Sequence, residues 1–165
     1  SKKKLYYIPG FLFLILSFYS TYAIRIDSNS GLEYFLIILL ICISTDLGGY
    51  IFGKILKGPR LTKISPKKTY SGVVGGYLLS IIFFYLFFNS TYYSYTSEMT
   101  PYFFIFILLT STVSQLGDIT ISYFKRLSKI KDTGKIIPGH GGLLDRIDGM
   151  IFAYPFCYII YLYFN

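Results

Sequence analysis

The stretch LEYFLIILLICISTDLGGYIF, residues 32–52, decides the fold class of this chain. It is almost free of charge, and as a helix it is long enough to cross a hydrocarbon core of about 30 Å. Four more apolar blocks lie at residues 5–24, 73–88, 102 to about 121, and 150–164. The sequence therefore predicts an all-α fold, a polytopic transmembrane helical bundle with about five membrane helices.

Composition supports a membrane protein and argues against several other classes. Hydrophobic residues make up 53% of the chain and charged residues only 15%, whereas a soluble domain carries about 25% charged residues. Little sequence is left for a soluble domain that could present a groove, so nucleic acid is not expected as a partner. Cys42 and Cys157 lie inside apolar blocks, which predicts small buried hydrophobic residues and not a disulfide or metal pair.

Positive charge is concentrated in two stretches between the apolar blocks. Residues 54–68 and residues 125–146 each contain six lysine or arginine residues. Because cytoplasmic loops are enriched in such cations, these two basic loops and the N-terminus are expected in the cytoplasm, with the C-terminus outside. The net charge of +8 has a second interpretation, which is the binding of phosphates or anionic lipid head groups.

Five of the eight acidic residues lie toward the predicted cytoplasmic side, namely Asp46, Asp118, Asp132, Asp145 and Asp148. Two of them, Asp46 and Asp118, lie within apolar blocks. An ionised carboxylate that faces lipid costs at least about 2.5 kcal/mol, so these two side chains are expected to face protein, a cation or water. An interhelical hydrogen bond or a pair with a nearby lysine would meet this requirement as well as a functional site would.

Three polar residues share one face of a predicted helix in the fourth block. Asp118, Ser122 and Lys125 recur at spacings of four and three residues, which places them in line along a helix. Such a stripe can hold a divalent cation at one level and a phosphate at the next. A plain Asp–Lys pair is the simpler alternative.

A glycine-rich loop follows this stripe and contains the single histidine of the chain, His140. Glycines let backbone N–H groups turn toward an anion, but the spacing matches neither a P-loop nor a dinucleotide fingerprint. A lone histidine is more often a structural hydrogen-bonding group than a catalyst. Beyond the loop, Asp145 and Asp148 are one helical turn apart, and paired carboxylates near phosphates suit Mg²⁺.

Taken together, these polar residues resemble the signature of the phosphatidate cytidylyltransferase family. The similar residues are Ser122-Tyr123-Phe124-Lys125-Arg126, Lys131-Asp132 and Pro138-Gly139-His140-Gly141-Gly142-Leu143-Leu144-Asp145-Arg146-Ile147-Asp148. Upstream, similarity to the family's first conserved helix end and to its Ser-Pro-Lys-Lys-Thr loop is carried by Asp46, Tyr50, Gly53, Lys54 and residues 64–69. The resemblance covers roughly residues 46–148. It departs at Ser71, where the family commonly has a glutamate.

The resemblance implies a membrane enzyme that transfers the cytidylyl group of CTP to phosphatidic acid, forming CDP-diacylglycerol and pyrophosphate in phospholipid biosynthesis. It also implies Mg²⁺ and a second, monovalent cation such as K⁺. The expected metal ligands are Asp118 and Asp145, with Asp148 and Asp46 as weaker candidates. The expected catalytic residues are Lys125, Arg126, Lys131, Asp132 and His140. The expected substrate-binding residues are Ser65, Lys67, Lys68, Ser122, Gly139, Gly141, Gly142 and Arg146.

The resemblance further implies a single membrane-embedded catalytic domain over residues 1–165. Residues 1–31 would supply an N-terminal helix and outer loop, and residues 32–165 the signature-bearing core. Bacterial members are commonly longer at the N-terminus, so we expect this chain to correspond to their catalytic C-terminal portion. We expect it in the bacterial inner (cytoplasmic) membrane, with the site facing the cytoplasm, the lipid bilayer as a partner, and two copies forming a homodimer.

Two other functions are compatible with parts of the sequence. A CTP-dependent lipid kinase of the dolichol kinase type would transfer the γ-phosphoryl group and release CDP. A non-catalytic, truncated paralogue would account for Ser71 and for the short N-terminus. The length of the signature between Ser122 and Asp148 favours the cytidylyltransferase over the kinase. Against a non-catalytic paralogue, the polar residues of the signature are intact, namely Asp118, Lys131, Asp132, His140, Asp145 and Asp148.

Overall fold

The computed structural model describes residues 7–27, 30–62, 65, 68–88, 101–130, 133–134, 142 and 144–164. In this part of the chain the regular structure is helical, and the β-type pairing is limited to an isolated bridge between Arg60 and Thr69. The helices are α1 (Tyr7–Ile26), α2 (Gly31–Leu56), α3 (Tyr70–Phe88), α4 (Pro101–Leu127), α5 (Leu144–Ile147) and α6 (Met150–Phe164). The predicted all-α helical bundle is confirmed.

Each predicted apolar block forms a helix, but the five differ in length. Among the described residues, α1 to α4 are long and apolar enough to span a membrane. Helix α6 has 15 residues, which corresponds to about 22 Å and falls short of a hydrocarbon core of about 30 Å. The structure therefore supports four full-length spans and one shorter apolar helix where the sequence predicted about five spans.

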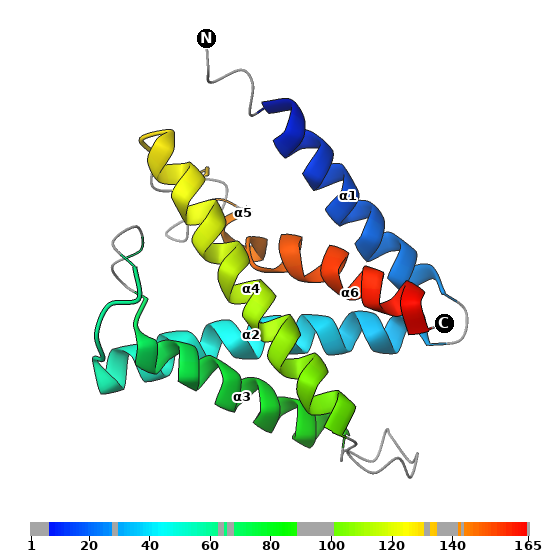
Figure 1. The fold of residues 1–165 in the computed structure, drawn as a ribbon, viewed down its shortest axis with the longest axis horizontal. Coiled ribbons are helices and arrows are strands. Elements are labelled where there is room, and N and C mark those ends of the chain that lie inside the picture. The colour runs from blue at the N-terminus through cyan, green and yellow to red at the C-terminus, as the bar shows by residue number, and fades with distance from the viewer. Residues whose placement is uncertain are drawn as a thin grey trace.

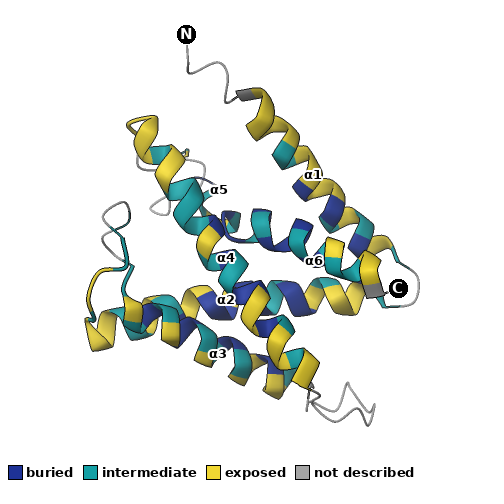
Figure 2. Cartoon of the chain, viewed as in Figure 1, coloured by how far each residue is buried: buried dark blue, intermediate teal, exposed yellow. Residues whose placement is uncertain are grey.

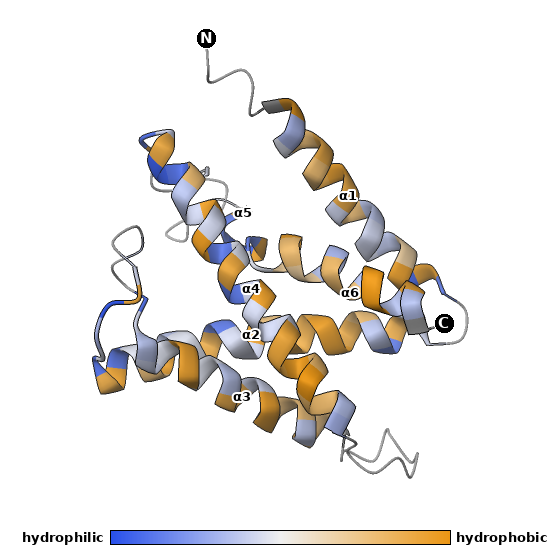
Figure 3. Cartoon of the chain, viewed as in Figure 1, coloured by the Kyte–Doolittle hydropathy of each residue, from blue (hydrophilic) through white to orange (hydrophobic). Residues whose placement is uncertain are grey.

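Helices α2 and α4 continue past the ends of their apolar blocks. Residues from the two basic stretches form the last turns of these helices, Lys54 in α2 and Lys125 and Arg126 in α4. The helical position predicted for Lys125 is confirmed. Cations in a last turn are stabilised by the negative end of the helix dipole. The two helices therefore extend the membrane bundle into its polar end, where Figure 3 shows hydrophilic residues gathered.

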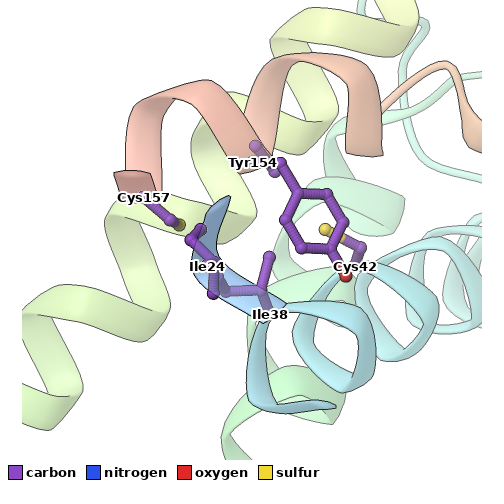
Figure 4. Close-up of a cluster of buried hydrophobic side chains, with 6 residues drawn as sticks. Ile24, Ile38, Cys42, Tyr154 and Cys157 are labelled. Carbon is purple, nitrogen blue, oxygen red and sulfur yellow. The ribbon is translucent and has the colours of Figure 1, made fainter. Parts of the chain in front are cut away.

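Helix α2 is the central element of the bundle. It contacts α1, α3, α4 and α6, and α3 runs along its side while α4 crosses both (Figure 1). Buried residues concentrate where α2, α4 and α6 meet (Figure 2). One core cluster joins α1, α2 and α6 (Figure 4), and its buried members are Ile24, Ile38, Cys42, Ala153, Tyr154 and Cys157. The two cysteines are free and buried, as predicted.

The outer surface of the bundle is apolar, as a lipid-facing surface requires. Phe11, Leu12 and Ile15 of α1, for example, are at least 50% exposed. In water such a surface would be an aggregation liability, whereas in a bilayer it is solvated by acyl chains. This arrangement fits the membrane location predicted from the sequence.

Glycines allow α2 and α3 to pack at very short range. A Cβ added at Gly48 would overlap the backbone of Gly75, and one added at Gly75 would overlap the ring of Phe52. Small residues at helix crossings are typical of membrane bundles because they let backbones approach. The close contact holds together the end of α2 and the start of α3, which both contribute to the site described below.

Gly48→Ala is expected to destabilise the bundle, because the added methyl group meets backbone atoms that cannot move aside. Overpacking of this kind typically costs about 1–3 kcal/mol. We expect a lower thermal unfolding midpoint in detergent, measured by circular dichroism. Gly10→Ala is the matched control, since a Cβ at Gly10 meets nothing within 4 Å. Equal midpoints for the two variants would contradict the packing account.

Candidate active site

A cavity of about 350 Å³ opens at the polar end of the bundle. Helices α2, α3, α4 and α5 and the segment between α2 and α3 all contribute to its wall. Its charged lining residues are Asp46, Lys68, Asp118, Asp145, Arg146 and Asp148. Asp46 and Asp118 both line this cavity, a position that agrees with the expectation that they face away from lipid.

Lys68 and Asp118 form an ion pair across the cavity. The Lys68 ammonium also donates to the backbone carbonyl of Gln115 at 3.4 Å, and the Ser122 hydroxyl donates to Asp118 Oδ1 at 3.4 Å. Both charged side chains are about one quarter exposed, at 23% and 26%. The pair is therefore reachable by a solute, and it links the segment before α3 to α4.

Lys125 lies between two carboxylates that follow the glycine-rich loop. Its Nζ is 3.0 Å from Asp145 Oδ1 and 3.6 Å from Asp148 Oδ2. All three side chains are only 10–12% exposed. Asp118 and Lys125 of the predicted stripe therefore do not pair with each other. Asp118 pairs with Lys68, and Lys125 pairs with Asp145 and Asp148.

Asp145 is the most extensively hydrogen-bonded acid of the site. Its Oδ2 accepts backbone N–H groups from Thr133 and Gly142, both at 2.9 Å. Burial raises the pKa of the Asp145 carboxyl, but these two amides and the ammonium of Lys125 outweigh that effect and lower the pKa to about 2. Asp145 is therefore ionised at neutral pH, and it ties the two ends of the glycine-rich loop to α5.

Asp148 is buried and has the opposite electrostatic behaviour. Its Oδ1 accepts the backbone N–H of Gly149 at 3.0 Å. Burial, followed by the negative charge of Asp118, raises the pKa of Asp148 to about 7, against the lowering effect of Lys125. A positive charge added nearby, such as that of a metal ion, would stabilise the ionised form of this carboxyl.

A profile of the Cytidylyltransferase family matches residues 2–164 of the chain. The chain belongs to the cytidylyltransferase family. It is 42% identical over 142 residues to the phosphatidate cytidylyltransferase of Rickettsia bellii, an alignment that covers 81% of this chain and 60% of that protein. The phosphatidate cytidylyltransferase of Bacillus subtilis is 34% identical over 158 residues, covering 93% and 56%, respectively. That of Haemophilus influenzae is 34% identical over 160 residues, covering 96% and 53%.

The chain therefore spans between 53% and 60% of the length of these three relatives. The region that matches the family profile includes every residue that lines the cavity.

The acidic residues of the cavity provide oxygen donors of the type that Mg²⁺ prefers. Among the described residues, no three His, Cys, Asp or Glu side chains are grouped closely enough to hold a metal by themselves. Mg²⁺ is usually bound by one or two carboxylates, with waters and substrate phosphates completing the shell. The donor set fits that kind of shared site better than a closed protein cage.

Most predicted site residues that the structure describes lie in or beside the cavity. Ser65 and Arg146 line it, and Gly142 contributes its backbone N–H to Asp145. Arg126 is exposed and does not line the cavity; its Nη1 donates to the carbonyl of Ile130 at 3.4 Å. The remaining predicted residues lie outside the described part of the chain: Lys67, Lys131, Asp132, Gly139, His140 and Gly141.

A polar layer beneath the charged residues was not predicted from the sequence. Thr45 and Gln115 line the cavity, and both bond the buried hydroxyl of Ser111, Thr45 Oγ1 at 2.9 Å and Gln115 Nε2 at 3.3 Å. The sequence does contain a pattern that could have indicated it, since the polar residues Ser111 and Gln115 are four residues apart in an apolar helix and share one face. The bond between Thr45 and Ser111 joins α2 to α4, and the bond from Gln115 holds Ser111 within α4.

Proposed function

We propose that this chain transfers the cytidylyl group of CTP to phosphatidic acid and forms CDP-diacylglycerol and pyrophosphate. The observation that carries the proposal is the cavity of mixed charge at the polar end of a membrane bundle. A water-soluble nucleotide and a lipid phosphate can both reach such a place. The phosphatidate cytidylyltransferases to which the chain is similar bear this activity in their names.

In the proposed reaction, an oxygen of the phosphatidate phosphate attacks the α-phosphorus of CTP. A bond forms between that oxygen and the α-phosphorus, and the bond from the α-phosphorus to the oxygen bridging to the β-phosphorus breaks. The electron pair leaves with pyrophosphate. Because two polyanions must meet, the site has to neutralise charge and align the reacting atoms, which is most of what catalysis requires here.

We assign the neutralising role to the lining cations. Lys68 and Arg146 face the cavity and are proposed to contact the phosphates of CTP or phosphatidic acid. Lys125 is proposed to act closer to the acids it pairs with, holding Asp145 and Asp148 in place. Ser122 is proposed to orient a phosphate oxygen from beside Asp118.

Mg²⁺ would be held by Asp118 and Asp145, with Asp148 and Asp46 as further candidate ligands in the same cavity. When bound, it would neutralise phosphate charge and orient the triphosphate. A second, monovalent cation such as K⁺ belongs to the proposal through the family resemblance. The resemblance also supports roles for Lys67, Lys131, Asp132, Gly139, His140 and Gly141.

We also infer an inner-membrane location, with the cavity on the cytoplasmic side and the N-terminus inside. The basic residues at the ends of α2 and α4 support this orientation. It would bring the cavity to the side on which CTP is available. A homodimer remains part of the proposal, since a second copy would help enclose two large substrates.

The position of isotopic label in the products tests this function. Purified protein in vesicles containing phosphatidic acid would receive Mg²⁺ and CTP labelled at either the α- or the γ-phosphorus. We expect the α-label in the extracted lipid and the γ-label in aqueous pyrophosphate. Lipid carrying the γ-label when a lipid alcohol is supplied would instead identify a kinase. Unlabelled lipid in every case would contradict the proposal that this chain carries the reaction.

A further inference from the structure

Backbone hydrogen bonds join the beginning and the end of the segment between α2 and α3. Helix α2 ends where Lys57 adopts the left-handed conformation, with φ 44°. The chain then returns antiparallel to itself, with Leu61 N–H donating to the Lys68 carbonyl at 2.8 Å and Tyr70 N–H to the Pro59 carbonyl at 3.1 Å. Lys68 therefore lies on the returning arm, directly before α3.

Thr69 caps the first turn of α3. Its carbonyl accepts the N–H of Val73 at 3.1 Å, and its hydroxyl accepts the N–H of Gly72 at 3.1 Å. A threonine whose hydroxyl bonds the third amide of the helix is a standard N-cap, typically worth about 1 kcal/mol. The cap fixes the backbone of the residue next to Lys68.

Ser71 connects this cap to the end of α2. Its hydroxyl accepts the N–H of Gly58 at 3.2 Å and lies 3.0 Å from the hydroxyl of Thr69. The contact is close, since a Cβ added at Gly58 would lie 2.8 Å from Ser71 Oγ. Two hydroxyls and two backbone amides thus form one continuous chain from Gly58 to Gly72, which we name the hydroxyl latch.

We propose that the hydroxyl latch, Thr69 and Ser71, is a positioning element that directs Lys68 toward Asp118. This inference rests on the function proposed above. Lys68 reaches across the cavity to α4, where it pairs with Asp118 and bonds the Gln115 carbonyl. A long, flexible lysine side chain holds such a position better when the backbone of the residue next to it, here Thr69, is fixed. Neither latch residue touches the reacting atoms in this account.

The activity test uses Ser71→Ala and Thr69→Val, each of which removes one hydroxyl of the latch. Each is expected to lower kcat/KM for cytidylyl transfer roughly tenfold, the loss of one to two hydrogen bonds. Ser80→Ala is the matched control, because Ser80 lies on the same helix and its hydroxyl bonds only the Tyr77 carbonyl among the contacts of the described residues. Ser71→Thr, which keeps a hydroxyl, is expected to recover most of the activity.

A double variant separates positioning from general destabilisation. If Ser71 acts through Lys68, Ser71→Ala added to Lys68→Ala is expected to cause little further loss. Fully multiplicative losses would overturn the proposal, because they would show that the latch serves the protein independently of Lys68.

A chemical readout that needs no turnover completes the test. Acetylation of Lys68 by an N-hydroxysuccinimide ester, followed by mass spectrometry, would be compared with that of exposed Lys129 in the same sample. We expect Lys68 to react several-fold faster in Ser71→Ala and Thr69→Val than in wild type or Ser80→Ala. If Lys68 reacts faster in the two variants but the wild type shows no cytidylyl transfer, the positioning role of the hydroxyl latch would be supported and the proposed function rejected. Unchanged Lys68 reactivity in both variants would overturn the latch.

Discussion

Asp118→Asn is expected to lower the rate of CDP-diacylglycerol formation by roughly 10²–10³-fold, the scale seen when one preorganised electrostatic group is removed. The substitution keeps the shape of the side chain but removes its charge. Lys68 then loses its ion-pair partner, and the cavity loses the carboxylate that lies beside both Ser122 and Lys68. The initial rate at saturating CTP and phosphatidic acid is the measurement.

Glu33→Gln is the matched control for this change. Glu33 is an exposed acid in the first turn of α2 and does not line the cavity. Its conversion to the amide is expected to leave the rate within about twofold of wild type, as for most exposed surface changes. If Asp118→Asn retained a similar rate, Asp118 would have no role in the chemistry.

Asp145→Asn is expected to cause a loss of turnover on the same scale of roughly 10²–10³-fold, together with a local structural change. The neutral amide cannot compensate Lys125, which is almost fully buried. It also offers a weaker acceptor to the N–H groups of Thr133 and Gly142. Removing one partner of a largely buried ion pair is costly, and Asp148, at 3.6 Å, would be the carboxylate left to pair with Lys125.

Hydrogen exchange distinguishes the two parts of this prediction. The amides of Thr133 and Gly142 are expected to exchange faster in Asp145→Asn than in wild type, while amides in the middle of α2 remain unchanged. Glu33→Gln serves again as the control. Loss of turnover with no change at either amide would assign Asp145 to the chemistry alone. Normal turnover in Asp145→Asn would show that Asp145 has no role in the reaction.

The helices were predictable because the membrane imposes a simple rule on the sequence. A long apolar block such as residues 32–52 has no other stable conformation in hydrocarbon than a helix. The cost of a carboxylate that faces lipid likewise predicts that Asp46 and Asp118 point away from the bilayer. Helix ends were less predictable, because the apolar blocks end at residue 52 and at about residue 121, whereas α2 and α4 continue through polar residues to Leu56 and Leu127.

The pairing of charges in the site could not be read from the sequence. The helical spacing of Asp118 and Lys125 made them natural partners, yet Asp118 pairs with Lys68, which is 50 positions earlier. That pairing depends on how the segment before α3 folds back, and on the short α2–α3 distance that the glycines permit. Lys125 pairs instead with Asp145 in α5 and with Asp148, which directly follows α5.

The role of Ser71 was equally hidden in the sequence. A serine where the family commonly has a glutamate suggests a lost function when only the residue type is compared. In the structure its hydroxyl bonds Gly58 and Thr69 and closes the segment that carries Lys68. Its contribution depends on a backbone amide 13 positions away, which no residue pattern reveals.

The claim that cytidylyl transfer takes place in the described cavity is tested most directly by protection of a single engineered thiol. Ile119→Cys would place a thiol in the cavity wall, and Ser128→Cys would place one on the exposed turn after α4. The native thiols of Cys42 and Cys157 are buried and free, so they should contribute little background. We predict that CTP with Mg²⁺ slows maleimide labelling of Ile119→Cys at least several-fold and leaves that of Ser128→Cys unchanged. Equal labelling of Ile119→Cys with and without CTP, in protein that still forms CDP-diacylglycerol, would contradict the account.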